Sequence, residues 1–115
     1  MNIIENFFWV DSVADMDMGI SVYFDCTLDN TIISLKAVPA GQPLAFAGAG
    51  YAQILPAFDD GGWEIDRGLH QFSWYPYDNA GTLISSATLY AIHLQWMEDG
   101  VVSSSVESAH NVRFA

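Results

Sequence analysis

The sequence predicts a single all-β domain over residues 1–115, an antiparallel β-sandwich or partly open barrel of about eight short strands. Segments 19–28 and 90–96 alternate apolar and polar residues with a period of two, so each is expected to turn one face to a core. Turn-forming residues recur about every ten to fifteen positions, as in sandwiches and barrels. No stretch of about a dozen residues carries the apolar stripe of an amphipathic helix.

The first half of the chain contains the clearest pair of strands. Segment 2–13 is ambiguous and fits either a strand or a short helix. Segments 19–28 and 31–38 both fit strands, the second rich in β-branched residues. Asp29-Asn30 between them tolerates positive φ and favours a tight turn, so the two strands are expected to form a hairpin.

Loop signals divide the rest of the chain. Asp59-Asp60-Gly61-Gly62 is the strongest of them, and Glu98-Asp99-Gly100 predicts a second hairpin. Gly48 and Gly50 indicate a bulged or closely packed strand around them. The remaining strands are expected at 44–56, 63–66, 69–75, 83–97, 101–108 and 112–115.

The composition of the chain favours protein partners and argues against nucleic acid and membranes. Hydrophobic residues make up 51% of the chain and charged residues 15%, with a formal charge of −11, so the apolar content exceeds what a small solitary domain needs. Lys36, Arg67 and Arg113 are the only basic residues apart from histidine, which argues against nucleic acid and against an anionic membrane. No apolar stretch approaches the roughly 20 residues that span a bilayer. The first ten residues lack the pattern of a signal peptide, so synthesis in the cytoplasm without export is expected.

A single cysteine excludes an internal disulfide. Cys26 falls on the apolar phase of segment 19–28, where a small buried hydrophobe is the expected role.

Acidic clusters raise the question of a metal. One cluster before the first clear strand and another in the central loop are able to supply the oxygen ligands of a composite Ca²⁺ site if the fold brings them together. Neither has the spacing of an EF-hand, and solvated turns are the expected role, so no metal and no cofactor is predicted. The acids concerned are Asp11, Asp15, Asp17, Asp59, Asp60 and Asp66.

The chain offers no convergent catalytic set. His70, His93 and His110 have no local zinc spacing, and no serine stands in a Gly-x-Ser-x-Gly motif. A protein that is not an enzyme is therefore expected.

Aromatic residues gather in segment 69–77. Phe72 and Trp74 share the inward phase of the strand, which leaves Tyr75 and Tyr77 exposed. Exposed rings of this kind suit a protein interface or a sugar-stacking platform.

The leading functional expectation is a structural subunit of a homo-oligomer or larger assembly, such as a capsid decoration or tail protein of a bacteriophage virion. A small acidic inhibitor or immunity protein that blocks a basic groove as a DNA mimic is the alternative, and a carbohydrate-binding module is the third. Contacts with other subunits are expected near the chain ends and in the aromatic segment, because ends that are held in place need partners. The expected interface residues are Phe7, Phe8, Trp9, Tyr75, Tyr77 and Phe114.

Overall fold

The computed structural model describes residues 3–9, 20–39, 41–75, 77–84, 88–106 and 110–112, and of these it describes only the backbone at 9, 88–89, 104–106 and 110–112. Over these ranges the chain forms β-strands, one short 3-10 turn and no α-helix, which confirms the all-β prediction. The strands are β1 (Ile4–Trp9), β2 (Ile20–Cys26), β3 (Thr31–Pro39), β4 (Ala52–Leu55), β5 (Trp63–Ile65), β6 (Gly68–Trp74), β7 (Thr88–Glu98), β8 (Val101–Val106) and β9 (His110–Val112).

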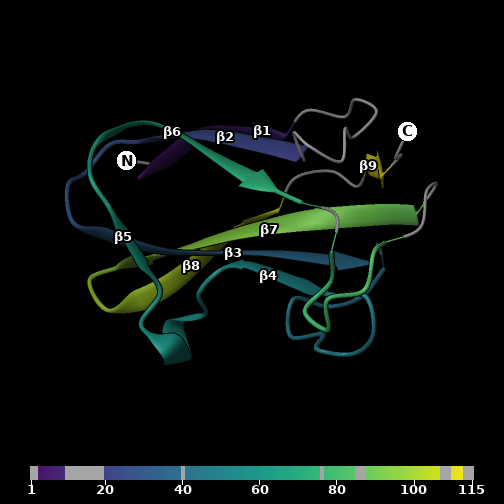
Figure 1. Cartoon of the computed structure of the whole chain (residues 1–115). Helices are drawn as coiled ribbons and strands as arrows, with labels where there is room; N and C mark the ends of the chain where they lie inside the picture. The colour runs from purple at the N-terminus through teal and green to yellow at the C-terminus, as the bar shows by residue number, and fades with distance from the viewer. Residues whose placement is uncertain are drawn as a thin grey trace.

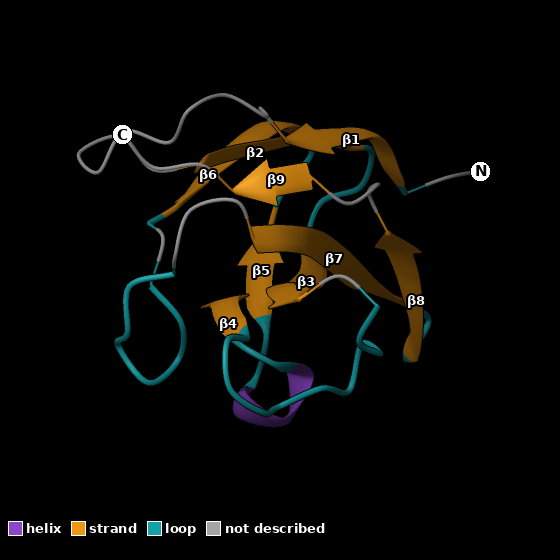
Figure 2. Cartoon of the chain, turned by 90° about the vertical axis from the view of Figure 1, so that its right-hand side faces the viewer, coloured by secondary structure: helices purple, strands orange, loops and turns teal. Residues whose placement is uncertain are grey.

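Two antiparallel sheets pack face to face as a sandwich. The three-stranded sheet has the order β1-β2-β6. The six-stranded sheet has the order β4-β3-β7-β8, with β5 also paired to β3 and β9 also paired to β7. Figure 1 shows the two layers from the side, and Figure 2 shows the same layers end-on, with the 3-10 turn on the side away from the three-stranded sheet.

The hairpin predicted at Asp29-Asn30 is wrong. β2 pairs with β1 and β6, whereas β3 pairs with β4, β5 and β7, so the turn carries the chain from one sheet to the other. Asn30 adopts the positive φ of 57° that the turn signal indicated. An alternating strand turns the same apolar face to the core whether the next strand in the sequence pairs with it in one sheet or lies in the opposite sheet. The alternation therefore does not distinguish a hairpin from a crossing between sheets.

The second predicted hairpin is confirmed. β7 and β8 pair in register from His93 opposite Val106 to Glu98 opposite Val101. The two residues between them, Asp99 and Gly100, have φ values of 50° and 79°, as a tight type I′ connection requires.

One edge of the six-stranded sheet is built from two separate strands. β4 pairs with Leu35–Ala37 of β3, and β5 pairs with Thr31–Ile33 of the same strand. Residues 56–62 leave the sheet between them and include the 3-10 turn Phe58–Asp60. The expected strand 44–56 is thereby reduced to β4, because its Gly-rich first part forms turns.

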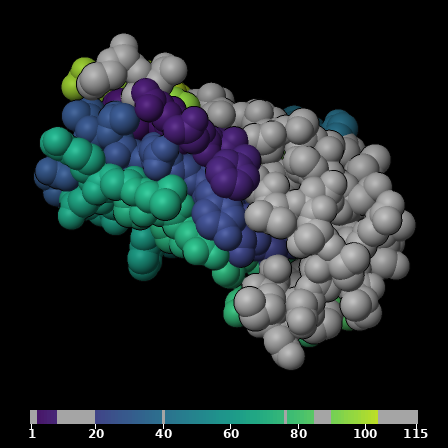
Figure 3. Space-filling model, turned by 90° about the horizontal axis from the view of Figure 1, so that it is seen from above, coloured from purple at the N-terminus to yellow at the C-terminus, as the bar shows by residue number. Residues whose placement is uncertain are grey.

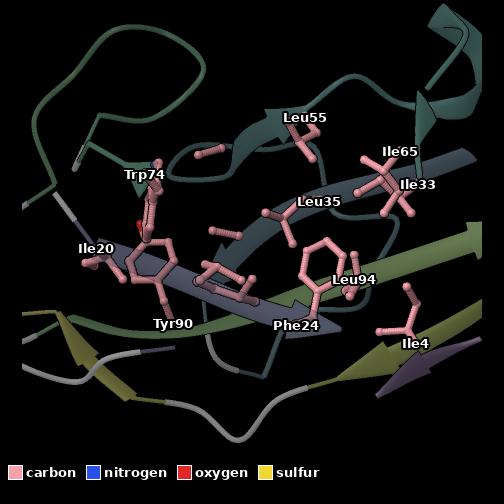
Figure 4. Close-up of a cluster of buried hydrophobic side chains, with 14 of the residues drawn as sticks. Ile4, Ile20, Phe24, Ile33, Leu35, Leu55, Ile65, Trp74, Tyr90 and Leu94 are labelled. Carbon is pink, nitrogen blue, oxygen red and sulfur yellow. The ribbon is translucent and has the colours of Figure 1, made fainter. Parts of the chain in front are cut away.

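The core lies between the sheets. Val22 and Phe24 of β2 face Ile33 and Leu35 of β3, and all four side chains are fully buried. Figure 4 shows this cluster together with Trp74 and Tyr90, whose rings lie 5.5 Å apart between centroids. Burying a side chain of this size contributes about 1.5–3 kcal/mol, so the alternating segments supply the principal stabilisation.

The thiol of Cys26 is buried in this core, as predicted. It lies within hydrogen-bond distance of the Leu28 carbonyl oxygen at 3.2 Å and of the Thr31 hydroxyl at 3.4 Å.

Candidate functional site

The outer face of the three-stranded sheet is the candidate site. Strand alternation turns Tyr23 outward from β2, because Val22 and Phe24 face the core. In β6 the same rule turns Leu69 and Gln71 outward, since the strand buries Trp74. The register then places Tyr23 between Phe8 of β1 and Gln71 of β6.

Aromatic and aliphatic side chains form the centre of this face. The rings of Phe8 and Tyr23 stack with centroids 5.1 Å apart and an interplanar angle of 16°. Phe8 is 48% exposed, and Leu69 is 72% exposed, the highest value among the described large hydrophobic residues that are exposed. Tyr75 extends the β6 alternation beyond Trp74 and is 49% exposed. We call Phe8, Tyr23, Leu69, Gln71 and Tyr75 the outer face.

Figure 3 looks onto the outer face, with β1 in purple, β2 in blue and β6 in teal lying side by side. Their side chains are in view, and no other described strand pairs outside β1 or β6. The face therefore presents apolar area to solvent, which a small protein rarely leaves uncovered without a role for it.

Polar groups border the aromatic centre. Glu5 and Asp25 stand opposite each other in the β1-β2 register, and the Asn6 side-chain amide donates to the Asp25 carboxylate at 2.7 Å. On the other side, the Gln71 side-chain amide donates to the Ser21 hydroxyl at 3.3 Å. A centre of rings with a polar border is the usual anatomy of a protein interface.

The six residues expected at an interface have different positions. Phe8 and Tyr75 lie on the outer face, whereas Phe7 is half-buried against the core. Tyr77 is exposed but belongs to the connection after β6, where it forms an isolated bridge with Leu83. The backbone of Trp9 lies in β1 and its side chain is not described, and Phe114 lies outside the described residues.

Three members of the outer face, Tyr23, Leu69 and Gln71, were not named from the sequence. Their places on one face depend on pairing β2 with β6, in which Tyr23 stands opposite Gln71 and Leu69 opposite Asp25. The signal for Leu69 was nevertheless present. Once Phe72 and Trp74 are assigned to the core, alternation requires Leu69 to point outward.

The acidic residues of the composite Ca²⁺ hypothesis are only partly described. Asp11, Asp15 and Asp17 lie outside the described residues. The Asp66 carboxylate accepts a hydrogen bond from the Asn30 amide at 3.1 Å, while Asp59 and Asp60 lie in the 3-10 turn. Within the described ranges, no three His, Cys, Asp or Glu side chains gather in a way that could hold a metal ion.

His70 lies in the three-stranded sheet, whereas His93 and His110 lie in the six-stranded sheet. His70 is in β6, where its ring stacks on Phe24 at 5.7 Å and its Nε2 lies 2.7 Å from the Asp66 carbonyl oxygen. His93 is in β7 and is buried, with no hydrogen-bond partner for either ring nitrogen. Burial, and then the nearby charge of Lys36, lower the pKa of His93. The backbone of His110 lies in β9.

Two hollows lie away from the outer face, and their polar groups already bond within the protein. The first, of about 380 Å³, has Lys36 and Gln53 in its lining. The Lys36 ammonium donates to the Leu44 carbonyl at 2.9 Å, and the Gln53 side-chain amide donates to the Ser34 hydroxyl at 3.0 Å. Burial lowers the pKa of Lys36.

The second hollow, of about 620 Å³, lies between residues 47–51 and 78–82. There the Asn79 side chain bonds both the Gln53 amide and the Tyr51 hydroxyl, each at 2.8 Å. The outer face is thus the more open candidate, because its rings have no covering partner among the described strands.

The described part of the chain contains no apolar helix of the length needed to cross a bilayer. Comparison with known proteins gave no match to any family model, to any curated protein or to any solved structure. The functional argument therefore rests on the geometry of this chain alone.

Proposed function

We propose that this protein is a non-enzymatic assembly subunit that binds other protein subunits through the outer face. The observation that carries the proposal is the exposed set of Phe8, Tyr23 and Leu69 on a continuous antiparallel sheet. Tyrosine and tryptophan are enriched among the few residues that dominate the binding energy of protein interfaces, and each such residue costs about 2 kcal/mol or more when it is truncated.

The border of the outer face supports specificity. Glu5 and Asp25 flank the apolar centre, so a partner with uncompensated acidic groups there is repelled. The formal charge of −11 has the same effect over longer distances and favours solubility of the assembled object. We expect each subunit to bury about 800 Å² or more, the share of one partner in a standard specific interface.

The setting that we propose for the assembly is a virion, with the chain acting as a capsid decoration or tail component. Such particles repeat one contact through many copies of a small chain, which suits a sandwich that presents an exposed apolar face. Mass spectrometry of purified virions from a source whose genome encodes this chain tests the setting. Absence of the chain from the virion would overturn the virion role. It would not bear on binding to other subunits, which the sedimentation experiment below tests.

Sedimentation of the purified chain between about 1 and 100 μM tests the interaction face, over the range in which weak specific contacts form. We expect a mass above the 12.7 kDa of one chain, and a shift to 12.7 kDa in Leu69→Asp. Val101→Asp is the matched control, because Val101 is 65% exposed on β8 and gains the same charge in the other sheet. A monomer for the unmodified chain, with no co-purifying protein, would overturn the proposal.

Salt separates this role from that of an acidic inhibitor. Association through an apolar centre is expected to persist or strengthen as salt rises. A contact based on carboxylates weakens steeply under the same conditions, because screening removes the attraction.

A further inference from the structure

The four sheet edges differ in how well a further strand fits them. β1 contains a register shift between Glu5 and Phe8, with Asn6 at a φ of 54°. The β4/β5 edge is interrupted by residues 56–62. Bulges and breaks of this kind protect an edge from added strands. Neither β6 nor β8 has a shift or a break within its own length, since β6 pairs with β2 over seven consecutive residues and β8 with β7 over six. β9 pairs with β7 farther along the side that β8 occupies, so of the described edges only the β6 edge is a single uninterrupted strand.

Both β6 and β8 lack the usual protective residues. The sequences of β6, GLHQFSW, and of β8, VVSSSV, contain no proline, lysine or carboxylate. No described strand pairs with the second edge of either one. Each therefore offers a row of backbone groups that another strand is able to bond.

Charge distinguishes the two edges. The hairpin turn that leads into β8 carries the exposed acids Glu98 and Asp99, so a second acidic chain that approaches the start of β8 meets two carboxylates. β6 begins directly after Arg67, whose side chain is 67% exposed and whose guanidinium lies 3.9 Å from the Asp29 carboxylate. Among the described residues that flank β6 and β8, Arg67 is the only cation. An acidic second copy therefore meets a basic group at β6 and only acidic groups at the start of β8.

The inward side of β6 is incompletely covered. His70 and Phe72 face the core and stack with ring centroids 6.3 Å apart, yet both are only half-buried. Phe72 also stacks on Phe24 of β2, at 5.9 Å. A further strand beside β6 would extend this row of rings and complete its burial.

We propose that β6 pairs antiparallel with β6 of a second copy, across a two-fold axis through Gln71. The proposal rests on the assembly function and adds one partner, a second copy, and one contact, at the edge of the sheet that carries the outer face. The joined sheet has six strands, and both outer faces lie on the same side of it.

The register follows from alternation. If both outer faces lie on one side of the joined sheet, each outward-facing residue must stand opposite an outward-facing residue of the second copy. The two-fold axis then lies at a residue position and not midway between two successive residues. Gln71 is the midpoint of Gly68–Trp74, and centring there uses all seven residues. Leu69 then stands opposite Ser73 of the second copy, and Arg67 opposite Tyr75, a cation beside a ring.

Single cysteines test this register. Residues directly opposite in an antiparallel pair have Cα atoms about 4.5–5.5 Å apart, within the range of a disulfide. Gln71→Cys is therefore expected to form a covalent dimer of twice 12.7 kDa under mild oxidation. Ser73→Cys is the matched control, because two copies of residue 73 are about 14 Å apart along the strand in this register. Mixing Leu69→Cys with Ser73→Cys is expected to restore the cross-link.

Charge variants give a second readout that needs no oxidation. Gln71→Glu alone and Gln71→Lys alone each place like charges at the axis and are expected to sediment at 12.7 kDa. An equimolar mixture is expected to recover the dimer, because opposite charges then meet. Circular dichroism of each variant checks that the fold is retained.

The outcomes separate this inference from the assembly function. If the unmodified chain associates and Leu69→Asp abolishes association, but Gln71→Cys and Ser73→Cys cross-link alike or not at all, the edge pairing is wrong while the assembly function stands. Selective cross-linking of Ser103→Cys would place the contact at β8 and also overturn it. A monomeric unmodified chain would refute pairing with a second copy, and the same result with no co-purifying protein would refute the assembly function as well.

Discussion

Asp29 and Asp66 each bind the backbone amide of the residue that follows the other. The Asp29 carboxylate accepts from the Arg67 amide at 3.0 Å, and the Asp66 carboxylate accepts from the Asn30 amide at 3.1 Å. The two turns that they join are the β2-β3 and β5-β6 crossings between the sheets. The exchange holds the crossings side by side at one end of the sandwich.

Removal of either carboxylate should loosen both crossings. Asp29→Ala and Asp66→Ala are each expected to lower the free energy of unfolding by about 1 kcal/mol, the net value of one hydrogen bond at an exposed site. The double variant is expected to lose less than the sum, because each single change already frees the shared end. Urea unfolding measures both effects. Asp60→Ala, in the exposed 3-10 turn, is the control, and an equal loss there would contradict the pairing.

Asn79 is expected to hold the β6-β7 connection against β4. Its side-chain oxygen accepts from the Gln53 amide, its side-chain nitrogen donates to the Tyr51 hydroxyl, and its backbone amide donates to the Tyr51 carbonyl, all at 2.8 Å. Asn79→Ala removes two of these bonds and should cost about 1–2 kcal/mol. Asn79→Asp keeps the acceptor and should cost less. Equal losses for the two variants in thermal unfolding would refute this role.

Stability should fall as the solution is acidified through the range in which His93 titrates. Because burial lowers its pKa in the folded protein, the unfolded chain takes up a proton first, and stability declines from about pH 6.5 downward until the folded-state pKa is passed. His93→Leu should flatten this part of the profile without loss at pH 7.5, since neither ring nitrogen has a partner. Urea unfolding at pH 5.5 and 7.5 makes the comparison. An unchanged pH profile in the variant would contradict the assignment.

Gly62 is expected to tolerate no side chain. It has a φ of 62°, and an added Cβ would lie 2.6 Å from Ile32 Cγ2 and 3.1 Å from the Ile33 carbonyl oxygen. Gly62→Ala should therefore destabilise the protein by about 2–3 kcal/mol, because overpacking adds to the cost of left-handed backbone. Gly61→Ala is the matched control, with a φ of 93° and open space around its Cβ, and should cost about 1 kcal/mol. Similar melting temperatures for the two variants would contradict the close approach.

Calcium should leave the thermal midpoint unchanged. The Asp66 carboxylate is already bonded to the Asn30 amide, and neither acidic cluster has the spacing of a Ca²⁺ loop. Unfolding is compared with chelator and with added Ca²⁺. A rise of several degrees on adding Ca²⁺ would restore the composite site that includes Asp11, Asp15 and Asp17.

The alternation of apolar and polar residues predicted where the strands lie better than it predicted which strands pair. Alternation identified β2 and β3 almost to their ends, because each residue's phase reports whether it faces a core. The turn at Asp99-Gly100 also predicted its pairing, since positive φ at both positions commits the chain to a tight hairpin. Asp29-Asn30 gave a similar signal, yet it crosses between sheets.

The candidate site was only partly predictable for the same reason. Exposure of Tyr75 follows from its own strand, whereas the contact of Phe8 with Tyr23 and the position of Leu69 beside them require two registers between distant segments. The sequence left the burial of His93 open. It lies on the more polar phase of β7, but that phase is covered at this point.

Because β4 and β5 pair separately with β3, the length of the segment between them, residues 56–62, does not affect either pairing. The exposed Asp59 and Asp60 lie in the middle of this excursion, on the side away from the three-stranded sheet. Lengthening a surface loop costs little, about 0.6 kcal/mol for each doubling of its length. A reporter peptide inserted there is expected to lie on the side of the sandwich away from the outer face and to leave that face uncovered.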